Sequence, residues 1–183
     1  MAVRYPIVPN TITIHLGAPD EAARNITVPF TDYISNVAAS ELYPTWPENA
    51  LVANIYAIIS FAMNRIYNEW YPSKGYNFDI TSSPIYDQSY TENKATYENI
   101  NNIVEEIFNN YVVKGEQIQP YFTQYCDGRK TTCDGLSQWG SVSLANQGKN
   151  PLDILKYYYG SDISIVYDAP VGDTIEEYPG YNI

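Results

Sequence analysis

The residue with the clearest chemical potential is Glu41, because it stands where an apolar side chain is expected. Residues 31–43 predict a helix, and positions spaced along one face of it hold Ile34, Val37, Ala38 and Glu41. A carboxylate there is exposed at the helix end, paired, or held in apolar surroundings that raise its pKa. In the third case it would stay protonated near neutral pH and could act as a general acid.

Two aspartates are candidate partners for Glu41. Ordinary glycoside hydrolysis needs a pair of carboxylates. Asp79 and Asp87 lie in residues 71–94, a long irregular segment of the kind that often carries function. A lytic transglycosylase needs only one carboxylate, because a hydroxyl of the sugar itself is the nucleophile.

Cys126 and Cys133 form a second candidate site. Six residues separate them, and this spacing suits a small disulfide, a metal site or two free thiols. Zinc requires three or four ligands, so a metal site would also need Asp127 or Asp134. The only histidine, His15, lies on a predicted strand and is better explained by hydrogen bonding than by catalysis.

Hydrophobic periodicity predicts the elements that must position these residues. Alternating apolar residues predict strands at residues 11–16 and 26–30, which could pair as a hairpin. The helix that carries Glu41 is ended by Pro44. A proline at the first helical position then begins a long central helix, residues 47–71.

The second half of the chain predicts further short elements. Helical spacing indicates a third helix over residues 95–113 and shorter helices over 137–148 and 151–160. Short strands are expected around 78–80 and over 163–167. The predicted fold is α+β: a single domain with a long central helix, several further helices and short antiparallel strands.

Length and charge narrow the classes of function. The chain has 183 residues, and we predict one domain over residues 1–167, followed by a Pro- and Gly-rich acidic tail or linker over 168–183. The net charge of -11 argues against a nucleic-acid partner, whose phosphates would be repelled. A polysaccharide suits this chain better, because its 19 tyrosines offer flat apolar faces with hydroxyl groups.

The N-terminal residues lack the continuous apolar core of a signal peptide. No segment is expected to reach the roughly 18 apolar residues of a membrane span. We therefore expect a protein that is made in soluble form and reaches a cell wall, spore or phage-like particle after release. A wall-binding module could once have followed the tail.

Three motifs resemble one known family. The first is "SELYPTWPENALVANIYAIISFAMNR", which is similar to that family's Glu-x-x-Pro and Trp-Pro-x-Glu-Ala-Leu pattern before an Ala-rich helix. The second, "CDGLSQWGSVSLANQGKNPLDILKYYYG", resembles its Gly-Met-Ser-Gln-Trp-Gly-Ala signature. Between them, "FDITSSPIYDQSY" resembles its Asp-Val … Gln-x-Tyr stretch. The family is that of stage II sporulation protein D (SpoIID), also called the LytB-type amidase-enhancer domain.

The resemblance implies a peptidoglycan lytic transglycosylase. Such enzymes cut peptide-free glycan strands between N-acetylmuramic acid and N-acetylglucosamine and leave 1,6-anhydro ends. The family's catalytic glutamate corresponds to Glu41. The second signature implies a glycan-binding role for Ser137, Gln138, Trp139 and Gly140, with Gln88 and Tyr90 nearby.

The sequence also departs from the family pattern. Some members bind zinc through a histidine and cysteines before the second signature, but here only Cys126 and Cys133 stand near that place. We therefore expect no cofactor, and a disulfide gains weight. The central helix holds bulky Ile and Asn where the family has Ala and Arg. Two alternatives follow: a non-catalytic glycan-binding or assembly subunit of a spore or phage-like particle, and an enhancer of an amidase.

Overall fold

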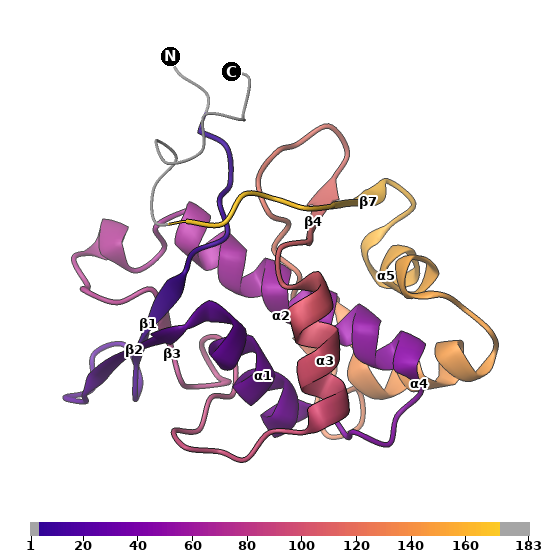
Figure 1. The fold of residues 1–183 in the computed structure, drawn as a ribbon, viewed down its shortest axis with the longest axis horizontal. Helices are drawn as coiled ribbons and strands as arrows, with labels where there is room; N and C mark the ends of the chain where they lie inside the picture. Colours follow the sequence, from indigo (N-terminus) through magenta and orange to yellow (C-terminus); the bar gives the residue numbers. More distant parts are fainter. Residues whose placement is uncertain (1–3, 173–183) are drawn as a thin grey trace.

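The computed structural model describes residues 4–172, and they fold as one α+β domain (Figure 1). The described helices are α1 (Phe30–Glu41), α2 (Glu48–Tyr67), α3 (Glu98–Ile107), α4 (Gln138–Asn146) and α5 (Pro151–Tyr159), with a 3-10 turn, η1 (Pro72–Lys74). The strands are β1 (Thr11–His15), β2 (Asn25–Pro29), β3 (Ile80–Thr81), β4 (Tyr111–Lys114), β5 (Tyr125–Cys126), β6 (Leu136–Ser137) and β7 (Ile163–Val166). The predicted fold class is confirmed.

The predicted hairpin leads directly into the helix that carries Glu41. β1 and β2 are antiparallel, with Ile12 opposite Val28, and β3 adds to the other edge of β1 in parallel. Ile12 and Ile14 are fully buried, because alternation places both on one face of the sheet. Phe30 follows β2 without a gap, so the register of the hairpin sets where α1 begins.

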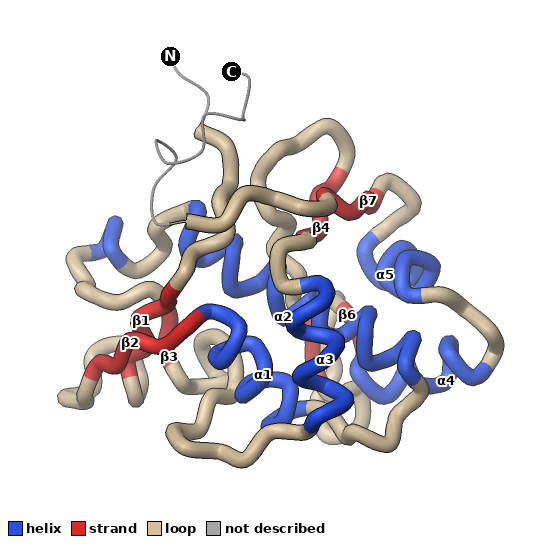
Figure 2. Tube along the Cα trace, in the orientation of Figure 1, coloured by secondary structure: helices blue, strands red, loops and turns tan. Residues whose placement is uncertain are grey.

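Helix α2 is the central element of the domain. It runs through the middle of the molecule in Figures 1 and 2 and contacts α1, α3, α4, α5 and β4. Contrary to expectation, the stretch Glu48–Lys74 is long and apolar enough to cross a membrane, and its most apolar 18-residue window has a mean hydropathy of 1.3. However, 83% of its most apolar window is buried inside the protein, which is also the pattern of the core helix of a soluble protein.

Polar residues on this buried helix hold the segments around it. The Asn54 amide donates to the Ser141 hydroxyl of α4 at 2.8 Å. The Ser60 hydroxyl accepts the backbone N–H of Val112 in β4, and the Asn64 amide donates to the carbonyl of Pro120. The asparagines that depart from the Ala-rich family pattern therefore satisfy backbone and side-chain groups of neighbouring elements.

All five predicted helices are longer than the observed ones, and two of them extend well past the observed ends. α3 ends at Ile107, and Tyr111 begins β4, which pairs with β7 so that Tyr111 lies opposite Val166. Tyr111, Val112 and Val113 are all buried, and periodicity cannot separate such an apolar run from a helical turn. α2 ends at Tyr67, and Glu69 shortly afterwards has a φ of 50°, which no helix accommodates.

The first residues of the predicted tail pack against the domain. Ala169 is buried and its N–H donates to the carbonyl of Asn109, and Val171 forms a parallel bridge with Val8. Residues 168–172 are therefore part of the fold. The rest of the predicted tail, residues 173–183, lies outside the described residues, so the division into domain and tail stays a prediction.

A short parallel pair of strands brings the second signature beside α2. Tyr125 of β5 lies opposite Leu136 of β6, and Cys126 lies opposite Ser137. The approach is so close that a Cβ on Gly135 would lie 1.8 Å from the carbonyl oxygen of Gln124. Glycine is therefore required there, and α4 begins directly after β6.

Candidate active site

A pocket of about 600 Å³ opens beside the last residue of α1. Its walls come from α1, the loop after β3, β5 with the turn that follows it, and the start of α4. The lining residues are Glu41, Pro84, Ile85, Asp87, Ser89, Tyr125, Cys126, Asp127, Thr131 and Gln138. The structure thus brings Glu41 and Gln138, from the two outer motifs, into one pocket.

The Glu41 carboxylate is partly buried and is surrounded by hydrogen-bond donors. Its Oε1 accepts the backbone N–H of Ser89 at 3.0 Å, and its Oε2 accepts the Gln138 amide at 3.4 Å. The Tyr125 hydroxyl is a further partner. Among the described residues, no salt bridge involves Glu41. All three groups donate to the ionised form of Glu41, and none of them is a carboxylate or carbonyl that would hold a proton on Glu41 away from a ligand in the pocket.

Burial raises the pKa of Glu41 to about 7. The Ser89 N–H, Tyr125 and Gln138 oppose this rise, because donors stabilise the ionised form. Near neutral pH the two protonation states of Glu41 are therefore populated to similar extents. A single group with this property can give a proton in one step and take one in the next.

A chain of buried side chains orients Tyr125 toward Glu41. The Tyr33 hydroxyl donates to Gln88 Oε1 at 2.7 Å, and Gln88 Nε2 donates to the carbonyl of Ile58 and to the Tyr125 hydroxyl. Because the Tyr125 oxygen accepts from Gln88, its own hydrogen is free for Glu41. Gln88 is fully buried and supports Tyr125 through this hydrogen bond, and its predicted contact with substrate stays a prediction.

The two aspartates predicted as partners of Glu41 are both hydrogen-bonded within the protein. Asp87 binds Arg65 Nε at 2.8 Å and also accepts from Tyr71 and Thr81. Asp79 accepts the backbone N–H of Thr13 at 2.8 Å and so joins the segment before β3 to β1. Neither of the predicted second carboxylates is therefore free to act with Glu41.

Asp127 is a third carboxylate in the pocket wall, and it too serves the backbone. The N–H groups of Thr131, Arg129 and Lys130 lower the pKa of Asp127 to about 2. Its carboxylate therefore stays ionised and fixes the turn that it begins.

A comparison with protein families gives a match to the stage II sporulation protein (SpoIID) model over residues 20–113, just over half of the chain. The chain belongs to the SpoIID family. That family is linked to peptidoglycan processing in sporulation. No curated protein matches the chain. The SpoIID match includes Glu41 and α2 but ends before Gln138, so the likeness in the second signature remains a resemblance.

In this SpoIID chain an amide on α1 fixes the segment that donates to Glu41. Asn36 Oδ1 accepts the backbone N–H of Thr91, and Asn36 Nδ2 donates to the Thr91 carbonyl. The Tyr90 ring stacks on Tyr33 and lines a separate hollow of about 380 Å³. Ser89 therefore faces the Glu41 pocket, whereas Tyr90 does not line it.

Ser137 and Gly140 of the second signature stabilise the start of α4, the helix that carries Gln138. Ser137 is the N-cap of α4 and accepts the N–H of Gly140 at 3.0 Å. A Cβ on Gly140 would lie 2.1 Å from the Tyr158 hydroxyl, so a larger residue there would displace the Tyr158 side chain. Ser137 lines a neighbouring hollow with Tyr158 rather than the Glu41 pocket. The glycan-binding roles of Ser137 and Gly140 stay predictions.

Trp139 is packed into a cluster of aromatic rings. Its ring centroid lies 4.9 Å from that of Trp46 and 5.6 Å from that of Tyr43. The guanidinium carbon of Arg129 lies 3.4 Å from the Trp139 centroid and covers its face. Tyr43, with 56% of its surface exposed, is therefore the ring of this cluster that is most open to a sugar.

Replacing Tyr125 with Phe is expected to raise the pKa of Glu41 further, because a donor to its ionised form is lost. A ¹³C NMR titration of the Glu41 side-chain carboxyl measures this directly. Tyr67→Phe is the matched control, since it removes a hydroxyl that donates to the carbonyl of Arg4 on an exposed surface. A Glu41 pKa that is unchanged or lower in Tyr125→Phe contradicts the orientation described above.

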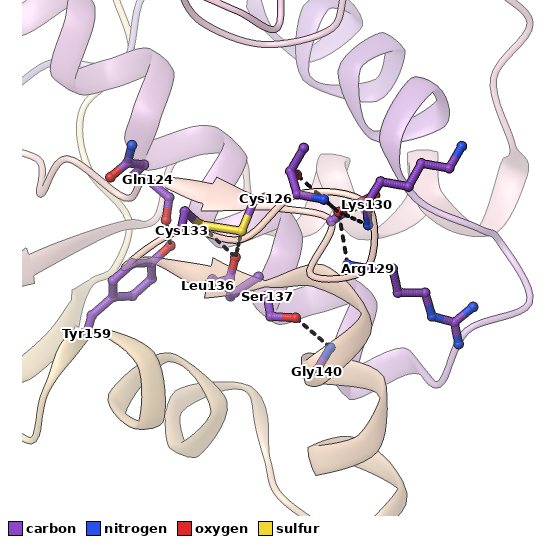
Figure 3. The surroundings of a disulfide bond; sticks show 11 residues. Gln124, Cys126, Arg129, Lys130, Cys133, Leu136, Ser137, Gly140 and Tyr159 are labelled. Atoms are coloured by element: carbon purple, nitrogen blue, oxygen red, sulfur yellow. Dashed lines mark hydrogen bonds between the residues drawn. A yellow bond between two sulfur atoms is a disulfide. The ribbon is translucent and has the colours of Figure 1, made fainter.

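The two cysteines form a disulfide, with their Cα atoms 6.1 Å apart (Figure 3). Within residues 4–172 no group of three His, Cys, Asp or Glu side chains is placed to hold a metal ion. His15 is buried, with Nδ1 near Asn25 Oδ1 and Nε2 near the carbonyl of Glu21, so its role is structural.

Removing this disulfide by a Cys126→Ser/Cys133→Ser double replacement is expected to lower the free energy of unfolding by about 2 kcal/mol, as for a short closed loop. Urea denaturation with and without reductant tests this. Reductant should destabilise the wild type and leave the double variant unchanged. Equal stability of oxidised and reduced wild type contradicts the prediction.

Proposed function

We propose that this chain is a peptidoglycan lytic transglycosylase that cuts glycan strands between N-acetylmuramic acid and N-acetylglucosamine. The proposal rests chiefly on Glu41, a carboxyl group with a pKa of about 7 in an open pocket, whose described hydrogen-bond partners are all donors. The SpoIID membership supports a role in peptidoglycan processing.

In the first step the protonated Glu41 acts as the acid. Its proton moves to the glycosidic oxygen, the bond from that oxygen to C1 of the muramyl sugar breaks, and the glucosaminyl part leaves as an alcohol. Positive charge develops on C1. The Ser89 N–H and the Tyr125 hydroxyl stabilise the carboxylate that remains.

In the second step the Glu41 carboxylate acts as the base. The C6 hydroxyl of the muramyl sugar attacks C1, the new C1–O6 bond forms, and the hydroxyl proton goes to Glu41. The product carries a 1,6-anhydro ring and the acid is restored, so no water is consumed.

The surrounding carboxylates favour this route over hydrolysis with two carboxylates. Asp87 is neutralised by Arg65, and Asp127 is held by backbone N–H groups of its own turn. Neither Asp87 nor Asp127 is therefore free to activate water or to attack the sugar.

Peptide-free glycan strands incubated with the protein test the proposal. Mass spectrometry should find 1,6-anhydromuramyl ends with the wild type, formed about 10³-fold faster than with Glu41→Gln. Reducing ends that contain ¹⁸O from labelled water would mean hydrolysis instead. Strand binding by both proteins without any product would mean a non-catalytic glycan-binding subunit, and stimulation of an added amidase would mean an enhancer.

A further inference from the structure

The turn beside the pocket presents two adjacent cations in a strongly acidic chain. The net charge is -11, and Arg129 and Lys130 are the one place in the sequence where two cationic residues adjoin. Both are exposed, and neither takes part in a salt bridge among the described residues. With 21 acidic residues in the chain, two neighbouring cations left without a carboxylate point to a ligand that carries a negative charge.

The turn that carries them is fixed from two sides. The disulfide closes it, and Asp127 accepts the backbone N–H groups of Arg129, Lys130 and Thr131 at 2.9 to 3.2 Å. Figure 3 shows the Arg129 and Lys130 side chains leaving the turn away from the disulfide and from each other. The backbone is therefore held while the charged ends remain free.

Arg129 is also oriented by its contact with Trp139. Its guanidinium lies 3.4 Å from the ring centroid, and stacking of this kind leaves the N–H groups at the edge of the guanidinium available for a carboxylate. Trp139 directly follows Gln138, whose amide donates to Glu41, and Asp127 and Thr131 of the same turn line the Glu41 pocket. Arg129 does not line the pocket itself, but it lies in the turn between two residues that do, Asp127 and Thr131.

We propose that Arg129, assisted by the charge of Lys130, binds the lactyl carboxylate of the muramyl sugar and is the residue through which this chain would recognise the peptide-free strands that the family resemblance implies as its substrate. This inference rests on the proposed function. In the disaccharide repeat the lactyl carboxyl is the ionisable group, and a stem peptide converts it to an amide without charge. A planar carboxylate suits the fork of N–H donors on Arg129, whereas the amide offers one oxygen and no charge.

The test compares two forms of one substrate. Peptide-free strands are used with their lactyl carboxyl groups free, or after conversion of these groups to methylamides. For the wild type we expect kcat/KM to fall about tenfold or more on amidation, as for loss of a charge-assisted bidentate contact. Arg129→Gln should show a similar loss on the free strands and little change on the amidated ones.

Two further variants separate recognition from net charge. Arg129→Lys keeps the charge but not the fork, and should recover part of the discrimination between the two strand forms. Lys149→Gln/Lys156→Gln removes two charges at a different hollow and should leave the discrimination unchanged. The wild-type preference should also weaken between low salt and about 0.5 M NaCl, because exposed charges are screened.

Two results would overturn the inference: equal cleavage of both strand forms by the wild type, or an Arg129→Gln loss that is the same on both. If no anhydro ends form at all, the proposed function fails first. Calorimetric binding of the two strand forms to the intact chain then still decides on Arg129, because the preference for the free carboxylate must persist in the dissociation constants.

Discussion

Glu41→Gln is expected to lower turnover on peptide-free strands about 10³-fold and, at the same time, to make the protein more stable above neutral pH. The loss of turnover follows because the amide can neither give nor take the proton, and general acid–base catalysis contributes about 10²- to 10⁴-fold. The gain in stability follows from the pKa of the carboxyl group.

Burial raises the pKa of Glu41 from 4.5 to about 7, so the folded protein binds this proton more tightly than the unfolded chain. The stability that results is fully present below pH 4.5 and is lost as the pH rises through 7. The loss approaches about 3 kcal/mol, at 1.36 kcal/mol for each pKa unit. Glutamine carries no charge and avoids this loss.

Urea denaturation at pH 4 and pH 8 measures the difference. The variant should match the wild type at pH 4 and exceed it at pH 8, by up to about 3 kcal/mol. Glu116→Gln, on an exposed turn after β4, is the control and should stay within about 0.5 kcal/mol of the wild type at both pH values. A Glu41→Gln variant that is less stable at pH 8 would show that the carboxylate is stabilised by its donors more than it is opposed by burial.

Asp87→Ala is expected to lower the free energy of unfolding by about 3–5 kcal/mol, because it leaves the charge of Arg65 buried without its partner. The side chain of Asp87 is 0% exposed and that of Arg65 is 10% exposed. The change also removes the acceptor of the Tyr71 hydroxyl and of the backbone N–H of Thr81. Denaturant unfolding of the purified variant measures the loss.

Asp162→Ala is the matched control for burial. Asp162 forms an ion pair with Lys114 at the same 2.8 Å separation, but its side chain is 52% exposed. The Asp162→Ala change should lower the free energy of unfolding by less than about 1 kcal/mol. Equal losses in the two variants would contradict the argument, because Asp87 is buried and serves the further donors of Tyr71 and Thr81, whereas Asp162 is exposed to water.

The double replacement Arg65→Met/Asp87→Leu should lower the free energy of unfolding less than Asp87→Ala alone, because it leaves no unpaired charge in the interior. The recovery will not be complete, because Arg65 also lies over the rings of Trp70 and Phe122. A double variant that is less stable than Asp87→Ala would assign most of the energy to these ring contacts.

The unusual position of Glu41 could be recognised from the sequence, because the evidence for it lies within a single helix. One turn of helix is enough to show that a carboxylate stands on an apolar face, and the resemblance of the second signature suggested that Gln138 would bind the same glycan. The hairpin and the long central helix were also predictable, since each has a clear period of its own. The strand β4 was not, because Tyr111 to Val113 continue an apolar pattern that fits a helix as well.

The contacts that give Glu41 its chemistry are not local. Tyr125 is one of 19 tyrosines, and nothing in its neighbours distinguishes the one that points at the carboxylate. Gln88 lies in a motif, which suggested contact with substrate, but a motif does not reveal that the side chain is buried. The ion pair of Asp87 with Arg65 is equally hidden, because its stability depends on exclusion of water by residues from several elements.

The sequence positions of the hydrogen-bond partners of Glu41 also determine at which stage of protein synthesis the site can form. Ser89 lies 48 residues after Glu41 in the sequence, and Gln138 lies 97 residues after it. Helices α1 and α2 therefore leave the ribosome long before all the hydrogen-bond donors to Glu41 have been synthesised. The hydrogen bonds that tune it require closure of long loops, which is slow compared with the formation of helices. A nascent chain that stops before α4 therefore holds Glu41 without its full set of donors, so the carboxyl group reaches its final environment only after α4 has been synthesised.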